Sequence, residues 1–250
     1  MKRLFLVLAL MFSASLPAQA PTAVPLREEP HHHFVFENDY VRVFRVSVPA
    51  HDATLLHQHD VPYLYISLGP ADVINAIQGR PEARLVMADG QLGYSPGHFA
   101  HIAHNESDAP FNNVTIELLH PQGEPRNICE KIIDGPLGKC PQPDSDPVVK
   151  ALSKYAREKW LLETDDTLAE SVAIGTGGLS GGAQRARLLI ACDKAELRVD
   201  LPGEPSTSLH GSEILWLDPG RTPSIKNLVE HRASRYLVIS FKDKGEARKP

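Results

Sequence analysis

Short apolar runs separated by turn residues make up residues 34 to 119 of the chain. The runs are rich in Val, Ile, Leu and Tyr, and turn residues stand between them at intervals of roughly 8 to 12 residues. Regular short strands of this kind are typical of a β-barrel or sandwich. The predicted strands are Val41–Val48 (read as two), Leu55–Gly69, Asp72–Ile77, Arg84–Met87, Gln91–Ser95, Phe99–Asn105 and Asn113–Leu119.

The pattern breaks at residues 121–147, which are rich in Pro, Gly and charge and have no sustained period. At the end of this stretch, Asp146 and Pro147 are typical of an N-cap followed by a first-turn proline. We therefore predict a short helix in the sequence VVKALSKYAREKWLLE that follows. Apolar runs return at about residue 163.

The second half repeats the first at low identity. A shift of 123 residues places SPGHFAHIAHN over DPGRTPSIKNL, and a shift of 124 places YLYISL over RLLIAC. An internal repeat of this length predicts a second barrel with the same strand order. The expected organisation is a signal peptide at 1–20, an arm at 21–30, a barrel at 31–120, a linker with a helix at 121–162, a second barrel at 163–245 and a tail at 246–250.

The first 20 residues carry two basic side chains, an apolar run and then Ala18-Gln19-Ala20. This order is typical of an export signal, with cleavage near Ala20. The run is shorter than the roughly 20 residues of a membrane-spanning helix, and no other stretch resembles one. We expect a periplasmic or secreted protein with no stable membrane span after processing.

Charge argues against nucleic acid as a partner. The net charge is −5, and removal of residues 1–20 with their two basic side chains would make it −7. Such a chain has no basic field that would attract nucleic acid. We expect a small-molecule substrate or ligand instead, and we also consider a homodimer.

The chain has three cysteines. Cys129 and Cys140 both lie in the linker, and a disulfide between them is plausible in an exported protein. Cys192, within LLIACDK, is left over, and we predict that it is a buried thiol.

Histidines carry the main chemical signal. In a strand, His57 and His59 point to the same face about 6.5 to 7 Å apart, so both can bind one metal ion. With 12 histidines in 250 residues, roughly 0.6 such pairs are expected by chance, so the pair alone is weak evidence. His31-His32-His33 contains another pair, and there we favour a solvated or edge-strand segment over a metal role.

A second stretch, Gly90 to Asn105, gives the first pair a context. Together the two stretches resemble the paired signature of the cupin superfamily, whose members are small antiparallel β-barrels. The second motif matches at Gly90, Pro96, His101 and Asn105. The first matches at His57 and His59, but Tyr63 or Leu64 stands where the family has its glutamate ligand.

The resemblance implies that His57, His59 and His101 are metal ligands. In the repeat His57 falls on Gly181 and His101 on Ser224, so the second half has no such set. The chain thus resembles a bicupin with an intact N-terminal barrel and a degenerate C-terminal one. The implied fold is all-β: two antiparallel double-stranded β-helix (jelly-roll) barrels joined by a Pro-rich linker and a short helix.

Three neutral imidazoles suit one divalent transition metal and leave coordination positions free. We favour iron, with Mn, Ni, Cu or Zn as alternatives. Tyr63 either donates a hydrogen bond at the metal, as a catalytic residue, or is a core aromatic. Glu117 either supplies a fourth ligand or lies on the wet face of its strand, which we favour. His98 and His104 are expected to point away from the site.

Three functions remain open at this point. The resemblance favours a mononuclear metal enzyme, dioxygenase-like, that acts on a small organic molecule in the first barrel. An isomerase or decarboxylase with Mn or Zn is a variant of it. A non-catalytic cupin that holds a metal or small ligand is the alternative from another class, because function belongs to the site and not to the scaffold.

Overall fold

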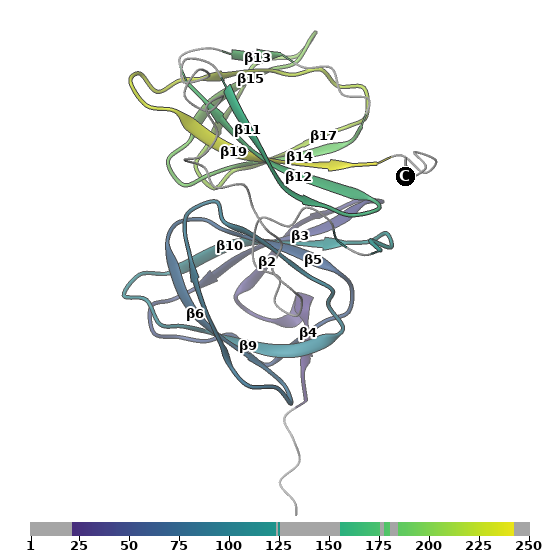
Figure 1. Cartoon of the computed structure of the whole chain (residues 1–250), viewed down its shortest axis with the longest axis vertical. Coiled ribbons are helices and arrows are strands. Elements are labelled where there is room, and N and C mark those ends of the chain that lie inside the picture. Colours follow the sequence, from purple (N-terminus) through teal and green to yellow (C-terminus); the bar gives the residue numbers. More distant parts are fainter. Residues whose placement is uncertain (1–21, 124, 126–155, 176–177, 181–184, 243–250) are drawn as a thin grey trace, which may run out of the picture.

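A computed structural model of the chain describes residues 22–123, 125, 156–175, 178–180 and 185–242. Within these residues the regular elements are β-strands and one 3₁₀ turn, η1 (Leu26–Glu28). The strands form two barrels that stack along the long axis of the molecule (Figure 1). No helix among the described residues is long and apolar enough to cross a membrane.

The first barrel consists of two five-stranded sheets. One sheet carries His57, His59 and His101 and has the order β1 (Val24–Pro25), β4 (His57–His59), β9 (Phe99–Asn105), β6 (Ala71–Ile77), β7 (Ala83–Met87). The other packs against the second barrel and has the order β2 (His32–Glu37), β3 (Val41–Val48), β10 (Phe111–Leu118), β5 (Tyr63–Ser67), β8 (Leu92–Ser95).

The second barrel repeats this plan. Its five-stranded sheet has the order β11 (Ala156–Glu163), β12 (Thr167–Ile174), β19 (Ser234–Phe241), β14 (Arg187–Ala191), β17 (Ile214–Leu217). Its four-stranded sheet has the order β13 (Gly178–Ser180), β18 (Ser224–Asn227), β15 (Glu196–Asp200), β16 (Thr207–His210).

The strand ladders reproduce the repeat seen in the sequence. Tyr63 pairs with Glu117 in the first barrel, and Arg187 pairs with Ser240 in the second. These pairs are related by the predicted shifts of 124 and 123 residues. The all-β fold with two barrels is therefore confirmed.

The helix predicted before the second barrel is wrong where the structure describes it. Residues Ala156–Glu163 form strand β11, which pairs with β12 from Ala156 to Glu163 with one register shift between Trp160 and Leu162. Good helix formers fill this segment, but pairing with a neighbouring strand overrides a weak local preference. Residues 147–155 lie outside the described residues, as do Cys129 and Cys140.

The run Leu55–Gly69, predicted as one strand, is two strands in different sheets. The break falls between His59 and Tyr63, where the turn that contains Gly97 packs against the corner. A Cβ at Gly97 would collide with the carbonyl oxygen of Val61, and Gly97 has a φ of +72°. This close approach explains why the Pro-Gly turn of the second motif needs glycine.

One hydrophobic core joins the two barrels. It lies between the sheet of β3, β10, β5 and β8 and the sheet of β12, β19 and β14, and each barrel has its own interior cluster besides. Val43, Leu64 and Ile116 enter it from the first barrel, and Leu188 and Phe241 from the second. The outer face of each sheet is thus covered by the other barrel.

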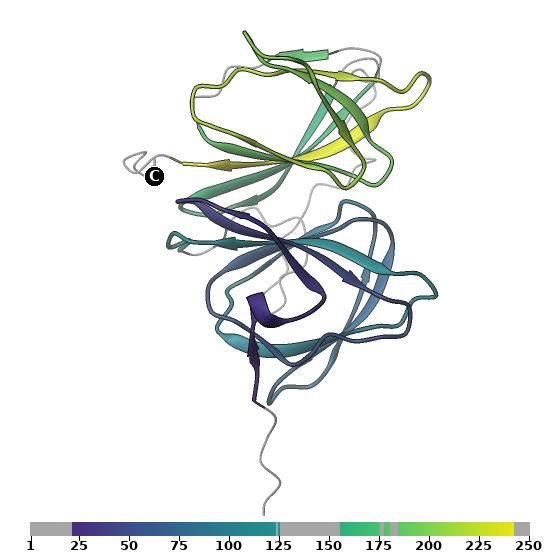
Figure 2. The same ribbon diagram turned by 180° about the vertical axis from the view of Figure 1, so that it is seen from behind.

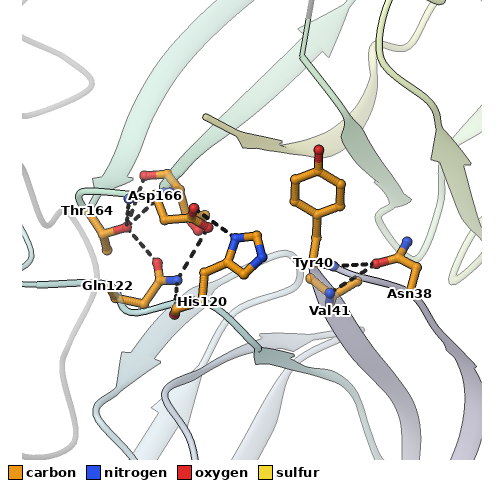
Figure 3. Close-up of polar contacts among 8 residues, drawn as sticks. Asn38, Tyr40, Val41, His120, Gln122, Thr164 and Asp166 are labelled. Carbon is orange, nitrogen blue, oxygen red and sulfur yellow. Dashed lines mark hydrogen bonds and ion pairs between the residues drawn. The ribbon is translucent and has the colours of Figure 1, made fainter. Parts of the chain in front are cut away.

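Polar contacts close one side of this interface (Figure 3). His120 lies 3.1 Å from Asp166 through Nδ1 and Oδ1, and the Thr164 hydroxyl donates to Gln122 Oε1 at 2.6 Å. The ring of Tyr40 lies 5.4 Å from that of His120. Residues from both barrels are therefore interlocked by hydrogen bonds as well as by apolar packing.

Cys192 lies at the interface, as the buried thiol that the sequence predicts. Burial raises the pKa of its thiol to about 12. At pH 8 we expect it to react with a disulfide reagent at least about a hundredfold more slowly in the folded protein than in the unfolded protein, because the thiolate is the reactive form. A Cys129→Ser/Cys140→Ser variant leaves this thiol as the only one. Rapid labelling of the folded variant would contradict its burial.

Candidate metal centre

The N-terminal segment lies along the strand that carries His57 and His59. Val24 pairs in parallel with His57, and the amide of Val24 donates to the carbonyl of Leu56 at 2.9 Å. The turn η1 follows and packs beside β4 (Figure 2). From Val24 onward, the residues predicted as an N-terminal arm are thus attached to the first barrel, and they lead directly into β2.

Four imidazole rings gather inside the first barrel. His57 and His101 are cross-strand partners on β4 and β9, with ring centroids 4.4 Å apart. His59 lies 5.1 Å from each of them, and His32, from β2, lies 4.7 Å from His57. All four side chains are buried. The three histidines named from the sequence are brought together, and a fourth joins them.

Hydrogen bonds fix the orientation of three of the four rings. Nδ1 of His57 lies 2.8 Å from the carbonyl oxygen of Leu55. Nδ1 of His101 contacts Oδ1 of Asn75. Both partner atoms can only accept, so each Nδ1 carries the proton and each Nε2 keeps its lone pair. These two Nε2 atoms are buried and have no hydrogen-bond partner.

His32 is held in the same way by a carboxylate. Its Nδ1 lies 2.5 Å from Oε2 of Glu29, which is itself buried and also accepts hydrogen bonds from the amides of His31 and Leu55. Burial acts to raise the pKa of Glu29, but the bond to His32 and nearby charge outweigh it, so the pKa is lowered. An ionised carboxylate behind a histidine is a common support for a metal ligand.

His59 completes the group with a free buried nitrogen. Its Nδ1 is buried without a hydrogen-bond partner, and its ring stacks on Tyr63 at 3.9 Å. Three ring nitrogens, one each from His32, His57 and His59, lie within 4.8 Å of one another. Two nitrogens bound to one ion at about 2.1 Å are at most about 4.2 Å apart, so small side-chain shifts would bring these atoms onto one ion.

Electrostatics keep the four rings neutral. Burial, together with the neighbouring His32, lowers the pKa of His57 to about 4. Burial and neighbouring histidines also lower the pKa values of His59 and His101 well below their usual range. Burial lowers the pKa of His32 too, against the opposing effect of Glu29. Near neutral pH the lone pairs are therefore available to a metal without competition from protons.

The rings line a small cavity of about 50 Å³. This space has room for a few water molecules. Polar groups come from Thr54, Asn75, Asn113 and Thr115 in addition to the histidines. Much of the remaining wall is apolar: Val46, Val73, Leu85, Met87, Ala103 and Phe111.

Tyr63 and Glu117, the other two residues singled out from the sequence, have different surroundings. Tyr63 lines the cavity beside His59. Glu117 does not line it: its carboxylate is buried and accepts from Nη1 of Arg42 at 2.7 Å. It is therefore neither a wet-face residue, as we favoured, nor placed as a fourth ligand. Burial raises the pKa of Glu117, against the opposing effect of its bond to Arg42.

The motif neighbours of His101 lie outside the cavity. His98 is exposed and His104 half-buried, and neither lines it. The side-chain amide of Asn105 donates through Nδ2 to the carbonyls of Val48, Pro49 and Ala109, so it ties strand ends together as expected of a structural residue. In the second barrel Ser180 pairs with Ser224 at the position of the His57–His101 pair, one residue before the expected Gly181.

Sequence reasoning missed His32 and Glu29. For the His31-His32-His33 run we favoured a solvated or edge-strand segment over a metal role. His32 and His33 do lie on an edge strand, β2. The prediction of a solvated segment is wrong for His32, which is buried and lines the cavity. The neighbours fit it better: His31 is half-buried and His33 exposed. The available signal was Glu29 three residues before His32, a spacing at which a carboxylate can reach an imidazole.

Comparison with known proteins identifies the fold. No sequence-family model and no curated protein matches this chain. Similar solved structures include a cupin 2 conserved barrel domain protein from Leptotrichia buccalis (8% identity, 90% of this chain and 92% of that chain, TM-score 0.52). Another is a putative glyoxylate induced protein from Pseudomonas aeruginosa (10% identity, 94% of this chain and 96% of that chain, TM-score 0.60). A third is a salicylate 1,2-dioxygenase from Pseudoaminobacter salicylatoxidans (11% identity, 81% of this chain and 68% of that chain, TM-score 0.56). The fold is that of the cupin superfamily, with two barrels in one chain.

Proposed function

We propose that this protein binds one divalent transition metal in the first barrel, after export directed by residues 1–20. His57, His59 and His101 are the ligands expected from the motifs, and His32 is a fourth. The observation that carries the proposal is the set of buried, unpartnered ring nitrogens on His57, His59 and His101. A buried polar atom without a partner is costly, and a metal ion would satisfy all of them together.

The nitrogen ligands limit which metal ions are suited to the site. Imidazole nitrogen suits Fe, Ni, Cu and Zn better than Mg or Ca, which prefer oxygen ligands. We favour iron and a mononuclear, dioxygenase-like reaction on a small organic molecule. The metal would supply Lewis-acid or redox chemistry there. The chain orients the rings through Glu29, Leu55 and Asn75, and its apolar wall limits access of water.

The small cavity favours a second candidate, a non-catalytic metal-binding cupin. With four histidines at the ion, fewer coordination positions remain for a substrate than with three. A space of about 50 Å³ also admits only a small molecule beside the metal. Oxygen uptake by the loaded protein would favour the enzyme, and its absence with any small organic acid would favour the binding protein.

The first test is metal content. Elemental mass spectrometry of the protein purified without a His-tag should give about one Fe, Mn, Ni, Cu or Zn per chain. A His57→Ala/His59→Ala variant should lose it, because two of the nitrogens would be gone. A His98→Ala/His104→Ala variant is the matched control and should keep it, since neither residue lines the cavity. Metal absent from the wild type even after reconstitution would remove the proposal.

A further inference from the structure

Asn75 is placed to do more than orient His101. It lies on β6, is 2% exposed, and lines the cavity together with the histidines. Its Oδ1 faces the Nδ1 proton of His101, so its amide Nδ2 is turned elsewhere. That Nδ2 is buried and has no hydrogen-bond partner. A buried donor of this kind is expected to meet an acceptor when the protein is in use.

The two threonine hydroxyls of the wall already make hydrogen bonds. The hydroxyl of Thr54 accepts a hydrogen bond from the amide of Ala103 at 2.9 Å. The hydroxyl of Thr115 donates to Oδ1 of Asn113 at 3.1 Å. Because the remaining wall is largely apolar, the amide of Asn75 is a well-defined point of recognition for a bound acceptor.

Charge indicates what kind of acceptor would be bound. Four neutral imidazoles leave the full +2 charge of a divalent ion in place, and ionised Glu29 offsets one unit of it. A net charge of about +1 would then remain inside an apolar barrel, where uncompensated charge is costly. One monoanion beside the metal would neutralise it.

We propose that the cavity binds a small carboxylate monoanion of a few non-hydrogen atoms, which accepts a hydrogen bond from Nδ2 of Asn75. This inference rests on the proposed metal site. The size limit follows from a cavity that holds only a few water molecules. Asn75 is then a specificity-determining residue that selects an anion over a neutral molecule of the same shape.

The test uses the full-length protein loaded with Co²⁺, whose visible spectrum reports changes at the metal. Titration with formate should give a saturable spectral change in the wild type. In Asn75→Asp the acceptor for His101 is kept, while the donor becomes a negative charge. We expect cobalt to be retained and the formate Kd to rise at least about tenfold. The matched control, Asn113→Asp, adds the same charge elsewhere on the wall and should raise the Kd less than about threefold.

The outcomes separate this inference from the function on which it rests. Failure of the wild type to bind cobalt would contradict both the proposed metal site and the anion site. A cobalt-loaded wild type that does not respond to formate removes the anion site alone. Equal weakening in Asn75→Asp and Asn113→Asp, or none in Asn75→Asp, would show that general electrostatics and not the Asn75 donor decides binding, and so would overturn the role of Asn75.

A second measurement needs no variant, in case a buried aspartate at position 75 prevents folding. In the cobalt-loaded wild type, acetate should compete with formate, whereas acetamide, its neutral isostere, should not. Benzoate should fail because it is too large for the cavity. Competition by acetamide as strong as that by acetate would overturn selection for an anion, and competition by benzoate would overturn the size limit.

Discussion

Replacing His32 with alanine is expected to weaken metal binding by at least about 100-fold, even though no sequence motif marks this residue. Loss of an outer partner of a ligand already costs about 10- to 100-fold in metal affinity, so loss of a ligand should cost more. His32 lies with His57 and His59 in one group of closely spaced nitrogens and is held from behind by Glu29. The measurement is a competition titration of Co²⁺ or Zn²⁺ against a chelator of known affinity.

Two further variants make this test specific. His33→Ala removes the exposed neighbour of His32 and should leave the metal affinity unchanged. Glu29→Gln keeps the size of the side chain but removes its charge, and we expect about 10- to 100-fold weaker binding with the fold retained. Metal affinity in His32→Ala equal to that of the wild type would show that His57, His59 and His101 form the complete site.

The three motif histidines could be predicted from the sequence because each lies in a recognisable local pattern. Alternation along the strand places His57 and His59 on one face, and the Pro-Gly turn before His101 sets the register of β9 against β4. His32 could not be predicted in this way. Its place depends on the pairing of Val24 with His57 and on the path through η1, and neither contact leaves a pattern in the sequence.

The alternation of apolar residues also predicted most of the first barrel correctly. β6, β7, β8, β9 and β10 lie within one or two residues of the predicted bounds. The prediction of a helix failed at β11, where helix-forming residues form a strand because they pair with β12. It failed again at the corner before Tyr63, which depends on the distant turn at Gly97. In both places a tertiary contact outweighs a local preference.

The second barrel has a structural role although serines stand at its counterpart of the His57–His101 pair: it covers the outer face of one sheet of the first barrel. Val43, Leu64 and Ile116 point away from the metal cavity and would face water without the second barrel. Ser180 and Ser224 stand at the position of the His57–His101 pair, on the four-stranded sheet, whereas the five-stranded sheet covers the first barrel. The second barrel therefore supports the site from outside.

Leu188→Ala is therefore expected to destabilise both barrels together. Leu188 is fully buried in the core that joins them, and truncation of such a residue costs about 2 to 5 kcal/mol. For a chain of this size the Tm should fall by roughly 4 to 20 °C. Calorimetry on the metal-loaded protein should show one transition, with metal release at the same temperature. Leu228→Ala, the same change at a half-exposed position, should alter stability by no more than about 0.5 kcal/mol. A Leu188→Ala protein in which the second barrel unfolds at a lower temperature while the metal stays bound would show that the two barrels unfold independently. The first barrel would then be stable without the second packed against it.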